Sequence, residues 1–474
     1  MQYVSTRGSA PALDFEGVTL AGLASDGGLY VPGEWPRFTE AEIRAMRGLA
    51  YPDLAARIMA PFVTPSLTEA ELLAICHAVY GDFGHAAVAP LVQLDHQHWL
   101  LELFHGPTLA FKDVALQLLG RLFETFLERR DERLTIVGAT SGDTGSAAIQ
   151  AVAGLDRVEI FMLHPKGRVS DVQRRQMTTV RAPNVHNLAI EGSFDDAQAH
   201  VKRMFTDGDV TGRLNLGAVN SINWARLMAQ VVYYFSSALQ LGAPDRTVAY
   251  SVPTGNFGDV FAGYVAAKMG LPIERLIVAT NINDILHRAL SSGDYSAGGV
   301  TETITPSMDI QVSSNFERLL FAAGGRDGTA MAAQMHAFEA TRAMQLTTAQ
   351  TQGAAMLFTS ARADQVETAR ALQWAYRHAG QVIDPHTGVG LHCAQAVAAS
   401  VRSGVLAGVP IVTLATAHPA KFPDAVERAI GVRPALPARV GDLFGREESF
   451  LELAGDYATS RDHVLGHAAA SGAD

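Results

Sequence analysis

One lysine stands in a segment of the chain that is otherwise apolar. Lys112 lies within LELFHGPTLAFKDVALQLLG (101–120), shortly after a Gly-Pro-Thr turn (106–108). Burial of an amine disfavours its charged form, and a neutral amine is a nucleophile that can form a Schiff base. The alternative is a lysine whose ammonium group reaches solvent or is paired with Asp113. Lys112 is therefore a candidate catalytic residue.

Two glycine-rich turns each follow a predicted strand and precede a predicted helix. The first is SGDTG (141–145), after the β-branched run LTIVGAT (134–140), and the second is GNFGD (255–259), after TVAYSVPT (247–254). Such a turn leaves backbone N–H groups at the positive end of a helix dipole, which is a favourable place for an anion. Either turn alone is also common as a plain crossover connection. Together with the lysine, however, the two turns point to one family of enzymes.

Seven strings of residues carry a resemblance to that family. In chain order they are FHGPTLAFKD, ATSGDTGSAA, PKGRVSDVQRRQMTT, NSINWARLMAQVVYYF, PTGNFGDVFAGY, SMDIQVSSNFERLLF and ATAHPAKFPDAV. The chain resembles the threonine synthases of the long bacterial and fungal type, which belong to the fold-type II pyridoxal phosphate enzymes. The resemblance extends from residue 25 to about residue 428 and so covers most of the chain.

The resemblance implies a reaction and a cofactor. The reaction is the conversion of O-phospho-L-homoserine and water to L-threonine and phosphate, the last step of threonine biosynthesis. It is a carbon–oxygen lyase reaction that uses pyridoxal 5'-phosphate, which delocalises the charge left when a proton is removed from Cα. The substrate is a small molecule, and no metal ion is implied.

The resemblance also assigns the cofactor site. Lys112 would hold the cofactor covalently and act as the catalytic base. Thr416 would meet the pyridine nitrogen, or else be a strand-end hydroxyl that the backbone satisfies. Asp259 is expected to cap the following helix and to face away from the phosphate, and Lys421 is a less favoured rival to Lys112. The cofactor phosphate would be bound by the backbone N–H groups of Gly255, Asn256, Phe257 and Gly258.

The substrate needs sites for its carboxylate and its phosphate. The carboxylate is expected at the first glycine turn, formed by Ser141, Gly142, Asp143, Thr144 and Gly145. Many fold-type II relatives have Asn in place of Asp143, and an ionised Asp cannot donate a hydrogen bond, so the role of this residue is open. The substrate phosphate is expected at the start of a long helix, where an anion is stabilised and an arginine can bind it with two parallel hydrogen bonds. The residues of that group are Asn220, Ser221, Asn223 and Arg226.

Other polar residues are weaker candidates for the site. The basic residues of PKGRVSDVQRR are more consistent with a solvated surface than with phosphate binding. SMDIQVSSN (307–315) is expected to contribute Asp309, Ser313, Ser314 and Asn315 to the wall of the cleft. His386, His392 and Cys393 resemble a metal cluster on paper, but their helix has small residues on one face and a packed pair is favoured.

Strands and helices alternate from about residue 91 onward. Apolar runs predict strands at 158–165, 184–192, 275–281 and 408–416 in addition to those before the glycine turns, and a hairpin at 91–104. This alternation is typical of an α/β fold with doubly wound parallel sheets, in which ligands bind at the carboxyl ends of the strands.

Three parts are expected along the chain. Residues 1–90 are predicted to form a mainly helical N-terminal extension, in which TEAEIRAMRGL and TEAELLAICHAVYG have the Thr and Glu of capped helices. By the resemblance, 91–130 and 236–474 form a large cofactor-binding domain and 131–235 a smaller inserted α/β domain, with the active site in the cleft between them. The tail from about residue 455 is polar and rich in Ala and Gly and is expected to fray.

The composition limits the class of protein. The formal net charge of −11 argues against a general nucleic-acid binder, and no run of about 18 apolar residues predicts a membrane span. Two cysteines far apart and an N-terminus without a signal-peptide core indicate a reducing, cytoplasmic location. The chain is expected to act as a monomer or a homodimer.

Three other functions remain open from the sequence. One is a different fold-type II lyase, such as a serine or threonine dehydratase, which needs the lysine but no second phosphate site. Another is a phospho-lyase that releases phosphate and 2-oxobutyrate. The third is a nucleotide-binding regulatory module, although the chain contains no GxxxxGK[ST] motif.

Overall fold

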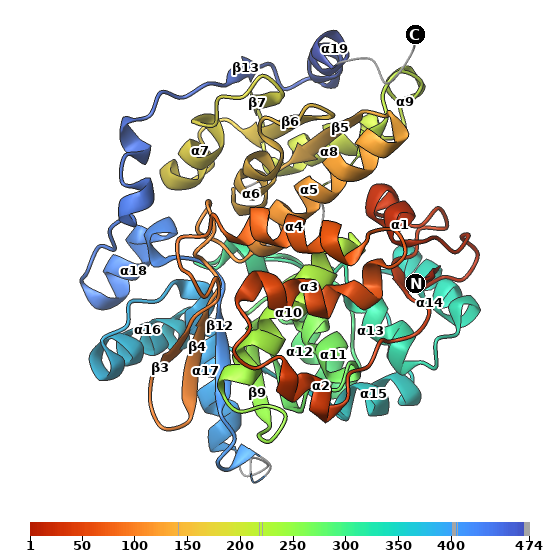
Figure 1. Cartoon of the computed structure of the whole chain (residues 1–474). Helices are drawn as coiled ribbons and strands as arrows, with labels where there is room; N and C mark the ends of the chain where they lie inside the picture. The colour runs from red at the N-terminus through yellow and green to blue at the C-terminus, as the bar shows by residue number, and fades with distance from the viewer. Residues whose placement is uncertain (141, 218, 220, 401–403, 405, 469–474) are drawn as a thin grey trace. The chain divides into compact units, whose positions relative to one another are not determined.

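The computed structural model describes all residues except 141, 218, 220, 401–403, 405 and 469–474 (Figure 1). The chain forms two compact units. Unit 1 consists of Met1–Val18, Leu23–His105 and Ser221–Ala435, and unit 2 of Thr19–Gly22, Gly106–Asn220 and Leu436–Asp474. The units thus change at other places along the chain than the boundaries expected at 90, 130 and 235, and the three predicted domains stay a prediction.

Unit 1 contains a six-stranded sheet in the order β11-β10-β9-β12-β4-β3. All neighbouring strands are parallel except β3 and β4, which form the predicted antiparallel hairpin. The central strands are buried along almost their whole length, as expected of a parallel sheet with both faces covered. The strands are β3 (Leu91–Gln93), β4 (His98–Glu102), β9 (Val248–Pro253), β10 (Ile273–Thr280), β11 (Phe358–Arg362) and β12 (Ile411–Ala415).

Helices cover this sheet. Helix α17 (Pro385–Ala399) packs Val389 and Cys393 against residues of β9, β10 and β12. Helix α10 (Trp224–Gln240) lies beside α3 and α11 (Figure 1). The others of this part are α11 (Gly258–Lys268), α12 (Ile285–Ser292), α13 (Phe316–Ala323), α14 (Gly328–Thr341), α15 (Thr348–Ala355), α16 (Gln365–Ala379) and α18 (Pro423–Ile430), with the 3₁₀ turns η1 (Pro306–Met308) and η3 (Pro419–Lys421).

The N-terminal residues are mainly helical, as predicted. The two predicted capping boxes are confirmed, because Thr39 exchanges hydrogen bonds with Glu42 and Thr68 with Glu71 at the starts of α2 and α4. The elements are β1 (Tyr3–Ser5), α1 (Phe15–Ala21), β2 (Tyr30–Pro32), α2 (Glu40–Ala45), α3 (Tyr51–Val63) and α4 (Glu69–Tyr80), and β1 pairs with β2.

Unit 2 contains a five-stranded, all-parallel sheet in the order β13-β7-β6-β5-β8. The predicted strands at 134–140, 158–165 and 184–192 are confirmed as β5, β6 and β7. The strands are β5 (Leu134–Ala139), β6 (Val158–Pro165), β7 (Val185–Ile190), β8 (Leu216–Gly217) and β13 (Leu451–Leu453), and the helices are α5 (Lys112–Arg130), α6 (Asp143–Val152), α7 (Asp171–Thr178), α8 (Phe194–Met204), α9 (Gly208–Thr211) and α19 (Tyr457–His467). The 3₁₀ turns η4 (Ala438–Val440) and η5 (Leu443–Gly445) lead to β13.

The expectation that the tail frays from about residue 455 is wrong for residues 457–467, and residues 469–474 lie outside the described residues. Residues 457–467 form α19, which begins behind the N-cap Asp456 and contacts α8. Tyr457 and Val464 are buried in a core cluster that also contains Phe161 and Leu163 of β6. The polar composition concealed the few apolar positions through which the helix is anchored, and burial of those positions outweighs the weak propensity of the segment.

Helices α5 and α6 approach each other closely at Gly120. A Cβ atom at this position would lie 2.2 Å from the carbonyl oxygen of Ala151. We expect Gly120→Ala to lower the free energy of unfolding by about 1–3 kcal/mol, because overpacking outweighs the better helix propensity of alanine. Urea unfolding measures this change. The control is Gly466→Ala in α19. A Cβ atom at that position would meet no other part of the protein within 4 Å, so no loss of stability is expected.

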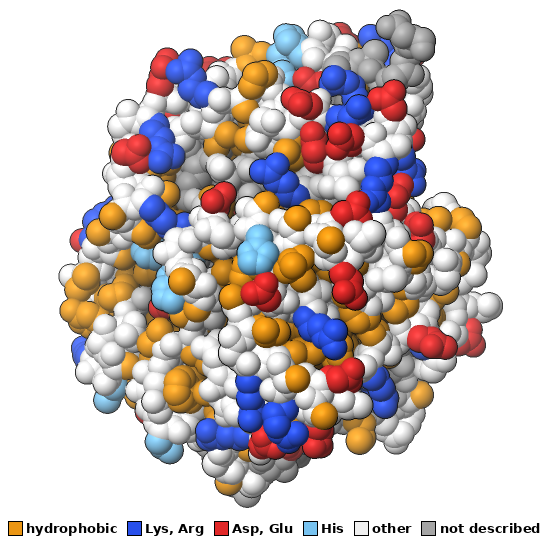
Figure 2. All heavy atoms as spheres, viewed as in Figure 1, with side chains coloured by type: hydrophobic (Ala, Val, Ile, Leu, Met, Phe, Trp, Pro, Cys, Tyr) orange, Lys and Arg blue, Asp and Glu red, His pale blue; other side chains and the backbone are white. Residues whose placement is uncertain are grey.

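Charges of both signs are interspersed over the face drawn in Figure 2. No helix within the described ranges is both long enough and apolar enough to cross a membrane.

Candidate active site

Lys112 is the first residue of α5. Its side chain is only 12% exposed, and Nζ lies 3.6 Å from Oδ2 of Asp143. The ammonium group also lies 4.7 Å from the centroid of the Phe111 ring. The lysine is therefore largely withdrawn from water, with a carboxylate of the first glycine turn beside it.

Asp113 fixes the turn that leads to Lys112. Its buried carboxylate accepts hydrogen bonds from the amide and the hydroxyl of Thr108, at 2.8 and 2.7 Å. Gly106 packs directly against this side chain, since a Cβ there would lie 2.3 Å from Cβ of Asp113. The glycine of the Gly-Pro-Thr turn is thus needed for close packing. The structure places Asp113 in a positioning role.

The first glycine turn is held by Thr140 at the end of β5. The amides of Gly142 and Gly145 both donate to its hydroxyl oxygen, at 3.0 and 2.9 Å. Helix α6 then begins at Asp143, followed by Thr144. Ser141 lies outside the described residues. Because two of the expected amide donors already bind Thr140, substrate binding at this turn stays a prediction.

The second glycine turn is pinned from one side by residues 313–315. The carbonyl oxygen of Gly255 accepts a hydrogen bond from the Ser313 hydroxyl at 2.7 Å. The carbonyl oxygen of Asn256 accepts two from Asn315, at 3.0 Å from its amide and 2.9 Å from its side chain. In a trans peptide the N–H points opposite to the C=O. The N–H groups of Asn256 and Phe257 therefore point away from this segment, as a phosphate site requires.

The helix after this turn completes an anion-binding corner. Phe257 is its N-cap, in the left-handed region at φ 62°, and α11 begins at Gly258. The first amides of a helix have no partner within it, and the positive end of its dipole lies there. Asp259 does not cap the helix as expected. Its carboxylate accepts hydrogen bonds from Tyr233 and Tyr234 of α10, at 2.5 and 3.0 Å.

A glycine at position 255 is required by space. A Cβ atom there would lie 2.6 Å from the carbonyl oxygen of Ser307, which belongs to the backbone and cannot easily move. We expect Gly255→Ala to displace the turn and to weaken phosphate binding at least about tenfold, since about 1.4 kcal/mol of lost hydrogen bonding suffices for that. Spectroscopic titration with pyridoxal phosphate measures the affinity. Gly299→Ala is the control, because nothing lies within 4 Å of a Cβ at that position.

The start of α10 lies next to this corner in unit 1. Asn315 also donates to the carbonyl oxygen of Ser221 at 3.1 Å, and the hydroxyls of Ser221 and Ser314 are 3.0 Å apart. Asn223 is the N-cap, with its side chain accepting from Ala225. Asn220 lies outside the described residues. The structure thus brings Ser221, one of the predicted phosphate ligands, close to the glycine turn.

Arg226 in the first turn of α10 is the most informative side chain of the site. It is 4% exposed, and burial lowers the pKa of its guanidinium to about 10. Among the described residues, its Nε and Nη1 atoms have no hydrogen-bond partner. A buried charged group without partners is costly, so such a group indicates an anion that binds there.

Arg318 of α13 is a positioning residue that the sequence did not reveal. It is fully buried, which lowers its pKa to about 9. The guanidinium donates to the side-chain oxygen of Asn315 and to the carbonyl oxygens of Tyr30 and Ile222. It therefore fixes the asparagine that holds both the glycine turn and Ser221. The one indication in the sequence was the spacing of three positions between Asn315 and Arg318, which places two side chains on the same face of a helix.

Thr416 follows directly after β12 and is 7% exposed. Since β12 pairs in parallel with β9, the strand that leads into the second glycine turn, both lie at the carboxyl edge of the same sheet. This is the edge where ligands of parallel sheets bind. The rival Lys421 is buried in η3 beyond the same strand. Contact of Thr416 with a pyridine ring stays a prediction.

Most of the weaker candidates have structural partners. Three basic side chains of 166–175 pair with glutamates of the C-terminal segment: Lys166 with Glu452, and Arg174 and Arg175 with Glu448. His386 bonds to Asp384 at 2.8 Å, and burial raises the pKa of the Cys393 thiol. No group of three metal-ligating side chains occurs in the part of the chain that is described.

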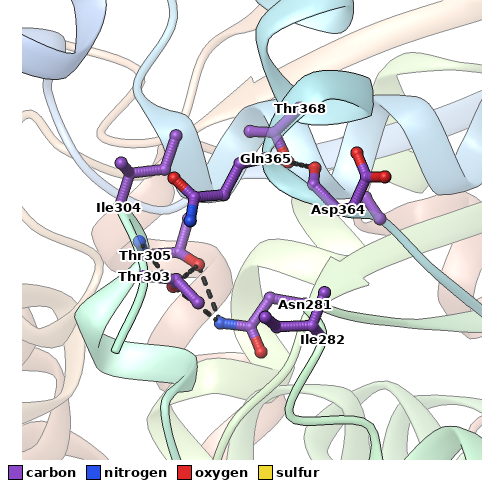
Figure 3. Close-up of a pocket in the computed structure, with 9 residues that line it drawn as sticks. Asn281, Ile282, Thr303, Ile304, Thr305, Asp364, Gln365 and Thr368 are labelled. Atoms are coloured by element: carbon purple, nitrogen blue, oxygen red, sulfur yellow. Dashed lines mark hydrogen bonds between the residues drawn. The ribbon is translucent and has the colours of Figure 1, made fainter. Parts of the chain in front are cut away.

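A small hollow lies beyond β10 and β11 (Figure 3). Asn281 lies on its wall and donates to the hydroxyls of Thr303 and Thr305 and to the carboxylate of Asp309, at 3.0, 2.9 and 2.6 Å. Asp309 thus fixes the segment around residue 303. Because these groups hydrogen-bond to one another, we interpret them as groups that hold the loop around residue 303 in place.

These features agree with comparisons to known proteins. The family model described as "Pyridoxal-phosphate dependent enzyme" matches residues 84–363, which defines the class. Those described as "Threonine synthase N terminus" and "Threonine synthase, C-terminal" match residues 2–80 and 387–464. A threonine synthase of Pseudomonas aeruginosa is 55% identical over 98% of both chains. The chain belongs to the threonine synthase family.

Two solved structures show the same fold over the full length. A PLP-bound threonine synthase from Brucella melitensis is 52% identical, with a TM-score of 0.95 over 98% of this chain and 99% of that chain. A threonine synthase from yeast is 39% identical, with a TM-score of 0.93 over 98% of both chains. The α/β fold with parallel sheets is therefore that of fold-type II enzymes, as the sequence predicts.

Proposed function

We propose that this enzyme converts O-phospho-L-homoserine and water to L-threonine and phosphate, with pyridoxal phosphate as its cofactor. The observation that carries the choice of a phosphorylated substrate is Arg226, a buried guanidinium with two unpartnered nitrogen atoms among the described residues. The backbone amides of the second glycine turn suit the cofactor phosphate, so Arg226 is left for a second anion. A dehydratase acting on serine or threonine needs no such group.

The residues fit the cofactor. The trans geometry of the second glycine turn directs amide N–H groups away from its anchoring segment, and Gly255 leaves space that a Cβ would fill. When bound, pyridoxal phosphate makes the Cα proton of an amino acid acidic. Lys112 would hold the cofactor and then, as a free amine, accept the Cα proton. Thr416 would offer a neutral hydroxyl to the pyridine nitrogen, which does not force a proton onto it.

The remaining steps need proton movement and exclusion of water. Lys112 would next help to remove a proton from Cβ, and phosphate would leave from Cγ. Arg226, with Ser221 and Asn223, would bind the phosphate and stabilise the charge that develops on it. A proton returned to Cγ, water added at Cβ and a proton returned to Cα give threonine, so the reaction consumes one water and releases one phosphate. The first glycine turn, with Gly142, Asp143, Thr144 and Gly145, would hold the substrate carboxylate.

A side-by-side assay with the purified holoenzyme tests this proposal. O-phospho-L-homoserine, L-serine and L-threonine are supplied separately, and threonine, phosphate and 2-oxobutyrate are measured. We expect threonine and phosphate in a one-to-one ratio from phosphohomoserine only. Formation of 2-oxobutyrate from threonine would identify a dehydratase instead, and phosphate with 2-oxobutyrate a phospho-lyase. The cytoplasmic location and the monomeric or dimeric state stay predictions.

A further inference from the structure

The carboxylate beside Lys112 is held by a residue of another helix. Gln173 of α7 is 7% exposed, and its Nε2 donates to Oδ1 of Asp143 at 2.8 Å. Its Oε1 accepts from the hydroxyl of Ser170 at 2.9 Å. Both ends of the carboxamide are thus bound, which fixes its orientation. Since an ionised aspartate only accepts hydrogen bonds, the amide nitrogen must face Asp143.

The first glycine turn is shaped to admit this side chain. Gly142 has φ 147°, a conformation that side chains rarely permit, and a Cβ there would lie 2.5 Å from Cδ of Gln173. Gly142 therefore has two roles. It permits the backbone conformation of the turn, and it leaves room for the carboxamide of Gln173 to pack against the turn. The contact between Gln173 and the turn is close-packed.

Helix α7 is itself anchored by the C-terminal segment. Arg174 and Arg175 both pair with Glu448, and the hydroxyl of Thr178 donates to the same carboxylate at 2.7 Å. These bonds join Glu448, shortly before β13, to the helix that carries Gln173. The position of Gln173 is thus determined by contacts within unit 2 that are independent of the lysine.

The two oxygen atoms of Asp143 have different partners. Oδ1 faces Gln173 and Oδ2 lies 3.6 Å from Nζ of Lys112. A hydrogen bond donated to a carboxylate favours its ionised form, and a carboxylate near an amine favours the ammonium form. We propose that Gln173 is a positioning residue for the reaction, which holds the ionised carboxylate of Asp143 toward Lys112 and thereby sets how tightly the lysine keeps its proton. This inference rests on the proposed function, in which Lys112 is the base.

The pH dependence of cofactor uptake tests this inference without substrate. The full chain is freed of cofactor with hydroxylamine, and the rate of covalent binding of pyridoxal phosphate is followed by absorbance as a function of pH. In Gln173→Leu the carboxylate of Asp143 loses its anchor, so the lysine should release its proton more readily. We expect the midpoint of the rate profile to fall by about one pH unit. Gln173→Asn, one methylene shorter, should give a smaller shift in the same direction.

Two further variants separate this role from a structural one. In Asp143→Asn the charge beside Lys112 is absent, so adding Gln173→Leu should leave the midpoint unchanged. Gln176→Leu removes a buried amide of the same helix that donates to the carbonyl oxygen of Thr108 at 2.9 Å, and it should leave the midpoint at the wild-type value. An equal shift in Gln176→Leu, or no shift in either Gln173 variant, would overturn the inference. A wild-type protein that takes up cofactor but does not convert phosphohomoserine would overturn the proposed function alone.

Discussion

Lys112→Ala is expected to lower kcat by about 10²–10⁴-fold from the loss of proton transfer alone, and to abolish covalent binding of the cofactor. The side chain lies at the first turn of α5 and is 12% exposed, so its removal leaves the packed part of the helix intact. The measurements are steady-state kinetics, and the mass of the protein after borohydride reduction. Wild type should gain one reduced cofactor, and the variant none.

The rival lysine supplies the control for this experiment. Lys421→Met keeps most of the volume of a side chain that is 1% exposed. We expect this variant to retain the reduced adduct on the peptide that contains residue 112. An adduct that persists in Lys112→Ala and disappears in Lys421→Met would show that Lys421, and not Lys112, binds the cofactor covalently.

Arg226→Met is expected to have the second largest effect. Loss of a buried partner for a charged phosphate costs about 2–5 kcal/mol, so kcat/KM for phosphohomoserine should fall by roughly 10²-fold or more. The substrate-free variant, in contrast, should be more stable than the wild type. Removal of a buried guanidinium, two of whose nitrogen atoms have no partner among the described residues, is expected to raise the free energy of unfolding by about 1 kcal/mol. Inorganic phosphate should raise the Tm of the wild type and have a smaller effect on the variant.

Arg318→Met is the matched control, because Arg318 is equally buried but fully hydrogen-bonded. Its removal leaves the acceptors of Asn315, Tyr30 and Ile222 without their donor. We expect the free energy of unfolding to fall by about 3 kcal/mol. A fall in the free energy of unfolding in both arginine variants would contradict the interpretation of Arg226 as an anion-binding residue.

Much of the fold follows from local patterns in the sequence. The β-branched run at 134–140 and the apolar run at 247–254 are buried parallel strands, and the capped helices after Thr39 and Thr68 begin where their Thr and Glu residues require. Such elements are determined by residues only a few positions apart. Helix α19 was missed because its stability depends on burial of a few side chains against α8, which the sequence does not display.

The candidate site was predictable where one string of residues contains the chemistry. Lys112 and the second glycine turn are of this kind. The partners that orient them come from distant parts of the chain: Gln173 is 30 positions from Asp143, and Asn315 is 59 positions from Asn256. Arg226 was preferred over Arg174 and Arg175 because it opens a long helix, but its burial and the pairing of the other two with Glu448 could not be read from the sequence.

The most direct test of the central claim is the fate of oxygen from water. The holoenzyme is incubated with O-phospho-L-homoserine in ¹⁸O-labelled water, and both products are analysed by mass spectrometry. If phosphate leaves by C–O cleavage at Cγ and water adds at Cβ, then threonine carries one ¹⁸O in its hydroxyl group and the released phosphate carries none. Labelled phosphate together with unlabelled homoserine would mean P–O cleavage, and would contradict the account.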